Sequence, residues 1–245
     1  MRIIQHDLQF YVDLLKTGKK YSFARFGNGE WGCILGTARH TGSGSQMLKI
    51  PALQRGLADS LKKRHATPDT YFLGIQSPGY LKRCRLLGGI KNWERTVCPW
   101  ITWHNGNVFH HASWKGRLHP LIAQLRKMNL IVVGPLWLKT LKKVFPQMQF
   151  VQVQRKDCFA TYKQIYQGIK RALRACPIEK GPVVISFSAG PTTKVLIHGL
   201  HDMVREGCYL IDFGSLWDPY CGKRSRRYHK RITPAIIKRN LTGKK

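Results

Sequence analysis

Acidic residues are scarce in this sequence. Its 245 residues include 12 Asp and Glu against 42 Lys and Arg, which gives a formal net charge of +30. A compact chain with this excess repels itself unless its working partner is polyanionic. We therefore expect nucleic acid, DNA above all, as the partner, with an anionic membrane surface or envelope polymer second. The scarcity also makes a carboxylate at a glycine-rich turn a candidate for chemistry.

Paired cysteines and long apolar runs are also lacking. The 7 cysteines are an odd number with no CxxC pair, which argues against a disulfide framework and a zinc ribbon. No stretch approaches the ~18 consecutive apolar residues of a membrane span, and no signal-peptide pattern opens the chain. We expect a cytoplasmic protein without a transmembrane segment, with one domain over residues 1–220 and a basic C-terminal tail over residues 221–245.

What the sequence does contain is an alternation of short apolar runs with amphipathic segments. This pattern is typical of a parallel sheet covered by helices on both faces, so we predict an α/β, Rossmann-like, mostly parallel sheet. A glycine-serine stretch at 42–45 predicts a loop. The predicted strands are 21–26, 71–75, 130–134, 150–153, 183–187 and 209–211, and the predicted helices are 4–17, 53–61, 136–144, 158–175 and 192–205.

Polar or glycine-rich residues follow four of these strands. They occupy residues 27–30, 134–135, 188–194 and 212–218. Ligands bind beyond the carboxyl ends of the strands in such sheets, so these segments predict a common site. Residues 188–194 also open a helix whose free backbone N–H groups suit a diphosphate.

These four segments, in this order, resemble the GT-D class of bacterial glycosyltransferases. The likeness is strongest at Arg25-Phe26-Gly27-Asn28-Gly29-Glu30, and it spans most of residues 20–220. The resemblance implies a glycosyltransferase with a nucleotide-sugar donor, most plausibly a UDP-sugar. We assign donor or phosphate binding to Arg25, Gly27, Asn28, Gly29, Ser188, Gly190, Thr192 and Lys194.

The resemblance also raises the question of a metal. In that family an Asp-x-Glu pair binds a divalent cation, and the matching residues here are Asn28 and Glu30. An amide oxygen brings no charge, so we expect weakened Mg²⁺ or Mn²⁺ binding. Surplus cations such as Arg25, Lys194 and Arg224 could neutralise a diphosphate instead.

Sugar transfer also needs a base for the acceptor hydroxyl. We assign catalytic roles to Glu30 at the donor end and to the carboxylates that follow the last strand, with Asp218 ranked ahead of Asp212 as the base. Simpler structural roles compete with these. Asn28 and Gly29 could form a tight turn with Glu30 as a helix cap, Asp212 could be a turn residue, and Lys194 could be a solvated helix lysine.

Two further segments bear on the acceptor. Residues 103–114 hold three of the ten histidines but no carboxylate, so we favour acceptor binding by Trp103 and His104 over a metal nuclease. Tryptophans buried in the core would give the same sequence pattern. From residue 219 onward there are ten Lys and Arg and no acid, and we assign nucleic-acid contact to Arg224, Arg226 and Arg227.

Three hypotheses result. The first is a glycosyltransferase that modifies a hydroxymethylated pyrimidine in DNA, as in phage-type DNA modification. The second keeps the enzyme but places the acceptor on a cell-envelope glycan or a protein. The third is a non-catalytic nucleic-acid-binding protein on the same fold, for which the Asn28 replacement is the best argument.

Overall fold

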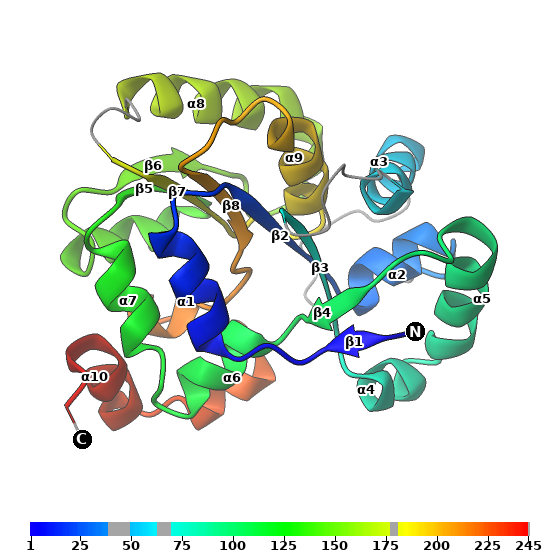
Figure 1. The fold of residues 1–245 in the computed structure, drawn as a ribbon, viewed down its shortest axis with the longest axis horizontal. Helices are drawn as coiled ribbons and strands as arrows, with labels where there is room; N and C mark the ends of the chain where they lie inside the picture. The colour runs from blue at the N-terminus through cyan, green and yellow to red at the C-terminus, as the bar shows by residue number, and fades with distance from the viewer. Residues whose placement is uncertain (39–49, 63–69, 177–180, 245) are drawn as a thin grey trace.

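A parallel eight-stranded sheet forms the centre of the molecule (Figure 1). The structure is a computed structural model that describes residues 1–38, 50–62, 70–176 and 181–244. The strand order is β1-β4-β3-β2-β8-β7-β5-β6, and every pairing is parallel. The strands are β1 Ile3–Ile4, β2 Tyr21–Phe26, β3 Tyr71–Ile75, β4 Trp103–Asn105, β5 Asn129–Gly134, β6 Gln149–Gln152, β7 Val183–Phe187 and β8 Cys208–Asp212.

Helices cover both faces of this sheet (Figure 1). One face carries α2 Asn28–Ile34, α3 Pro51–Lys62, α4 Pro78–Arg83, α5 Leu87–Val97, α8 Tyr162–Ala175 and α9 Thr192–His201. The opposite face carries α1 Leu8–Lys16, α6 Val108–Trp114, α7 His119–Leu125 and the 3₁₀ segments η1 Leu136–Lys143 and η4 Asp218–Cys221. The segments η2 Cys158–Thr161, η5 Arg227–Arg231 and α10 Pro234–Thr242 complete the described elements. The predicted α/β class with a doubly covered parallel sheet is confirmed.

The apolar runs of the sequence are explained by burial on two sides. In β5, Ile131 and Val133 pack into the core on the α8 and α9 face, whereas Leu130 and Val132 pack into the core on the α1 and α7 face. Each such side chain contributes roughly 1.5–3 kcal/mol through burial. A strand with a polar face would lose this contribution, so the central strands are continuously hydrophobic.

The direction of the connections creates a crevice. Some connections lead to a strand that lies nearer the β1 edge of the sheet, such as β2 to β3 and β7 to β8, and these run over the face that carries α3 and α9. Connections that lead to a strand nearer the β6 edge run over the opposite face. This is the pattern expected for connections of one hand. The chain leaves β2 toward one face and the neighbouring β8 toward the other, so the carboxyl ends of β2 and β8 border a topological switch point, where ligands bind in open α/β sheets.

The predicted C-terminal tail is wrong over residues 222–244. This segment contains η5 and α10, and α10 packs against α7 and α6. The fully buried Asn240 accepts a hydrogen bond from the Leu118 backbone (2.8 Å) and donates to the Ser113 carbonyl (2.8 Å). The basic residues therefore belong to a folded layer over the domain rather than to a detached arm.

The predicted elements are confirmed with changed ends. The 136–144 helix is the 3₁₀ segment η1, the 158–175 helix begins as η2, and the 192–205 helix ends at His201. The short strands β1 and β4 were not predicted. The loop predicted at 42–45 lies outside the described residues. In the part of the chain that the structure describes, no helix is long and apolar enough to cross a membrane.

Candidate active site

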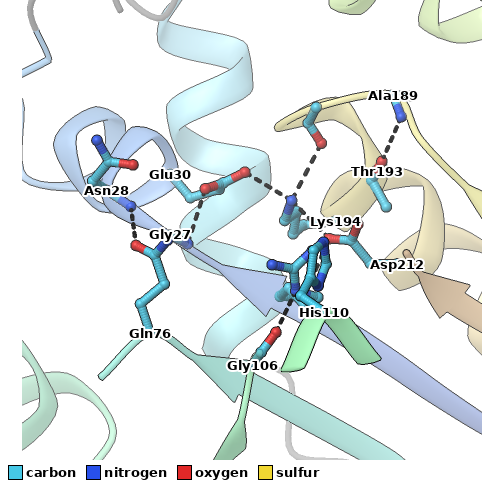
Figure 2. Close-up of polar contacts among 12 residues, drawn as sticks. Gly27, Asn28, Glu30, Gln76, Gly106, His110, Ala189, Thr193, Lys194 and Asp212 are labelled. Atoms are coloured by element: carbon cyan, nitrogen blue, oxygen red, sulfur yellow. Dashed lines mark hydrogen bonds and ion pairs between the residues drawn. The ribbon is translucent and has the colours of Figure 1, made fainter. Parts of the chain in front are cut away.

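A buried ion-pair cluster lies at the carboxyl ends of β2 and β8. The Lys194 ammonium contacts Glu30 Oε1 at 2.7 Å and Asp212 Oδ2 at 2.8 Å (Figure 2). Its third donor reaches the Gly190 carbonyl at 3.3 Å. The side chains of Lys194, Glu30 and Asp212 are 5%, 11% and 2% exposed. The interpretation of Lys194 as a solvated helix lysine is therefore wrong.

The local sequence explains how Glu30 is held. Gly27 follows β2 in an extended conformation and is the N-cap of α2, so Glu30 lies in the first turn of that helix. Its Oε2 accepts a hydrogen bond from the Gly27 backbone at 2.9 Å. Asn28 and Gly29 belong to the same turn, so they form no hairpin. Glu30 thus caps α2 with one oxygen and binds Lys194 with the other.

The charges of this cluster reinforce one another. Burial alone would raise the pKa of Glu30, but the adjacent Lys194 ammonium overrides burial and lowers that pKa below its ordinary value. Burial alone would lower the pKa of Lys194, but Asp212 and Glu30 raise that pKa above its ordinary value. The Lys194 ammonium is thus held between two carboxylates at the base of the site.

Arg25 lies beside this cluster and is held in place by three contacts. Its backbone N–H donates to Asp212 Oδ2 at 3.3 Å, its Nε to the Gly106 carbonyl at 2.5 Å, and its Nη1 to His110 Nε2 at 3.4 Å. Burial, and then the Arg25 charge, lower the pKa of His110 well below its usual range. His110 is therefore a neutral acceptor for Arg25, and the guanidinium is fixed within the protein.

A cleft of about 780 Å³ opens above the cluster. Its lining includes Asn28, Gly29 and Glu30 after β2, Ser188 and Gly190 after β7, and Asp218 after β8. Five cations from two segments also line it: Arg155, Lys223, Arg224, Arg226 and Arg227. Arg25, Gly27, Thr192, Lys194 and Asp212 do not line this cleft. Of these predicted site residues, Thr192, Lys194 and Asp212 are buried, whereas Arg25 and Gly27 are partly exposed.

Asp218 is the second carboxylate of the cleft. Its Oδ1 accepts a hydrogen bond from the indole Nε1 of Trp137 at 2.9 Å, and its Oδ2 accepts one from Ser225 Oγ. The residue is only 4% exposed, yet it lines the cleft. A carboxylate has about four acceptor positions, so these two bonds orient Asp218 and leave acceptor positions for a further donor.

Trp103 and His104 are not surface residues, and their assignment to nucleic-acid binding is wrong. Both lie in β4 under the helices, with Trp103 0% and His104 6% exposed. Trp103 packs edge-on against Phe26 and Trp31, and His104 Nδ1 bonds the hydroxyl of Tyr11 at 2.9 Å. Neither ring can stack on a base while the sheet is intact.

The predicted metal pair does not fit this geometry. Both oxygens of Glu30 are occupied, and a cation already lies 2.7 Å from one of them. The Asn28 side chain is exposed and points away from the Lys194 ammonium (Figure 2). Among the described residues, no group of three or more His, Cys, Asp or Glu could hold a metal ion.

Four residues of the site were missed in the sequence. Gln76 accepts the Asn28 N–H at 3.1 Å, Gly106 and His110 hold Arg25, and Trp137 binds Asp218. Gln76 and Gly106 directly follow β3 and β4, so the strand-end rule could have found Gln76 after its predicted strand. A second hollow of about 780 Å³ between β6 and α8 contains none of the predicted site residues.

Comparison with known proteins supports the fold. No family model and no curated protein match the sequence. A solved structure described as a new glycosyltransferase (DUF1792) from Streptococcus sanguinis is similar, with a TM-score of 0.68 and 15% identity over 89% of this chain and 84% of that chain. Another, described as a domain of unknown function 1792 with a distinct glycosyltransferase fold, has a TM-score of 0.65 and 15% identity over 90% of this chain and 80% of that chain. The chain therefore has the fold of these glycosyltransferase structures.

Proposed function

We propose that this protein is a glycosyltransferase that moves a sugar from a nucleotide-sugar donor to a hydroxyl acceptor. The observation that carries the proposal is the cleft at the β2 and β8 strand ends, where two carboxylates, Glu30 and Asp218, face a cation-rich lining. The shared fold with solved structures described as glycosyltransferases supports it.

The lining supports a nucleoside diphosphate, with a UDP-sugar as the first choice. The partly exposed rings of Tyr80 and Trp137 offer faces for a base, and Arg155 and Arg226 offer charge for the phosphates. The Ser188 to Pro191 segment adds the backbone before α9. In sugar transfer the bond from the anomeric carbon to the diphosphate breaks, and fixed cations stabilise the leaving anion.

We assign the base to Asp218. The acceptor hydroxyl forms the new bond to the anomeric carbon and transfers its proton to this carboxylate. Asp212 is the weaker candidate, because it is 2% exposed and its Oδ2 is bound to Lys194 and to the Arg25 backbone. Glu30 keeps the donor end of the site in place.

For the acceptor we propose a hydroxymethylated pyrimidine in DNA. The support is charge: the chain has a formal net charge of +30, and Lys223, Arg224, Arg226 and Arg227 line the cleft. These cations could track a phosphate backbone and bring the acceptor to the donor. With Trp103 buried, Tyr80 and Trp137 remain as stacking partners.

The test incubates the protein with pooled nucleotide-sugars and duplex DNA containing hydroxymethylated pyrimidines, and then weighs the digested nucleosides. We expect a hexose-sized mass gain that is lost in Asp218→Asn and Glu30→Gln and kept in Asp13→Asn, a control at an exposed carboxylate on α1. Release of free nucleoside diphosphate without a modified nucleoside would keep the enzyme and redirect the acceptor to an envelope glycan or a protein. Salt-dependent DNA binding with neither signal would refute the transferase and favour the binding protein.

A second measurement tests the DNA surface alone. Replacing Arg224, Arg226 and Arg227 by Gln should make the slope of log K against log salt shallower by about 3, since each phosphate contact contributes about 0.9. Glu30→Gln should leave DNA affinity nearly unchanged. An unchanged slope in the triple variant would remove this segment from the interface.

A further inference from the structure

The three oxygens around Lys194 form a cation site whose occupant is part of the chain. Glu30 Oε1, Asp212 Oδ2 and the Gly190 carbonyl lie 2.7, 2.8 and 3.3 Å from the ammonium. They come from three different segments: α2 after β2, the last residue of β8, and the loop after β7. Carboxylate and carbonyl oxygens are also the ligands preferred by Mg²⁺ and Mn²⁺.

We propose that the Lys194 ammonium is a built-in counter-cation that excludes a divalent metal from Glu30 and Asp212. A divalent ion bound to Glu30 would have to approach an ammonium that already lies 2.7 Å from the same carboxylate. Since Lys194 is 5% exposed, it has no solvent into which its charge can turn away. The two cations would repel each other strongly at low local dielectric.

The position of Lys194 in α9 explains why the ammonium stays in place. The residue lies in the first turn of this ten-residue helix, and its neighbours Thr192 and Thr193 are fully buried. Thr193 Oγ1 accepts the Ala189 backbone N–H at 3.1 Å (Figure 2), which fixes the loop ahead of the helix. The helix start is therefore anchored directly ahead of the lysine, and the ammonium cannot swing out without unpacking α9.

Asn28 agrees with this assignment. A second carboxylate at position 28 would add negative charge at the cleft beside Glu30, whereas the amide adds none. A metal needs that charge, and an internal ammonium does not. The sequence thus lacks an acid at Asn28 and supplies a cation at Lys194, and both features favour a site without a metal.

The test is a Mn²⁺ titration followed by electron paramagnetic resonance, which reports free Mn²⁺ and needs no turnover. Wild-type protein should show no binding that depends on Glu30. Lys194→Ala should bind one Mn²⁺ at least about tenfold more tightly than wild type, because it frees two carboxylates and a carbonyl. The gain should vanish in Lys194→Ala/Glu30→Gln. Lys163→Ala, at an exposed lysine on α8, should behave as wild type.

Two outcomes would overturn the proposal. One is Mn²⁺ binding by the wild type that Glu30→Gln abolishes. This result would refute the proposal even if Lys194→Ala does not fold. The other is a folded Lys194→Ala that gains no affinity. The inference concerns binding and stands apart from the proposed function. Absence of sugar transfer in every variant would count against the transferase alone, whereas transfer that chelator removes from the wild type would count against the counter-cation alone.

Discussion

Replacing Lys194 by Met should strongly destabilise the fold. Methionine keeps an unbranched apolar stem of similar length and removes the ammonium. Glu30 and Asp212 would then face each other as unpaired carboxylates in a site where their side chains are 11% and 2% exposed. The remaining donors to these carboxylates are backbone N–H groups, among them those of Gly27 and Arg25.

The size of the effect follows from this burial. Removing one partner of a buried ion pair costs about 3–5 kcal/mol, because the remaining charge stays desolvated. Whole domains are stable by only about 5–15 kcal/mol, so this is a large fraction. For a chain of this size each kcal/mol lowers the Tm by roughly 2–4 °C, which gives a decrease of about 6–20 °C.

Urea unfolding followed by circular dichroism measures the loss, with Lys163→Met on the exposed face of α8 as the control. The triple variant Lys194→Met/Glu30→Gln/Asp212→Asn should recover most of the lost stability, since isosteric neutral groups leave no charge buried. A loss below about 1 kcal/mol for Lys194→Met, or no recovery in the triple variant, would show that the ammonium is solvated in the protein and would refute the reasoning.

Three further predictions concern the scaffold. Burial, and then His6, lower the pKa of His104 to about 4, so the folded protein binds a proton at His104 less readily than the unfolded chain does. The free energy of unfolding should therefore fall by about 2 kcal/mol from pH 6.5 to pH 5. His104→Asn should flatten that part of a plot of the urea midpoint against pH. Asn240→Ala should lower the free energy of unfolding by about 3 kcal/mol in the same assay, because it leaves the Leu118 N–H and other buried groups without hydrogen-bond partners. A loss below about 1 kcal/mol would show that α10 contributes little to the stability of the fold. Gly214→Ala should lower the Tm and reduce turnover, because the φ of Gly214 is +54° and the new Cβ would lie 2.9 Å from Arg25 Nη1. Unchanged turnover would show that the position of Arg25 does not matter for the reaction.

The sheet was predictable because its physics is local. Strands such as β5 and β7 are buried on both faces, so each appears in the sequence as a short apolar run of its own. The strand-end rule then located Glu30 and Asp218 at one cleft, because the carboxyl ends of parallel strands share an edge. Two-residue β1 and three-residue β4 are too short to show periodicity, and they were missed.

The wrong predictions from the sequence concern residue types that suit two different environments. A tryptophan suits a base and a core equally well, and nothing in the sequence around Trp103 indicates that it is fully buried. The basic run after residue 219 has the composition of a solvated tail. Asn240 nevertheless fixes it through a side-chain bond to Leu118, across 122 positions of sequence. Long-range pairing of this kind leaves no local pattern.

Some of the scarce carboxylates are buried, and five cations line the cleft that Glu30 and Asp218 also line. Among the described residues, Glu30, Glu94, Asp212 and Asp218 are buried, and each has a partner within the protein. The net charge of +30 therefore creates a positive potential around a cleft whose lining includes the carboxylates of Glu30 and Asp218. Such a field draws anions toward the cleft and lowers the local concentration of divalent cations. A protein with this charge would recruit a metal poorly, whereas the Lys194 ammonium on α9 is always present. The overall basicity of the chain and the Lys194 ion pairs therefore both favour an internal ammonium, rather than a metal, as the cation that keeps Glu30 charged.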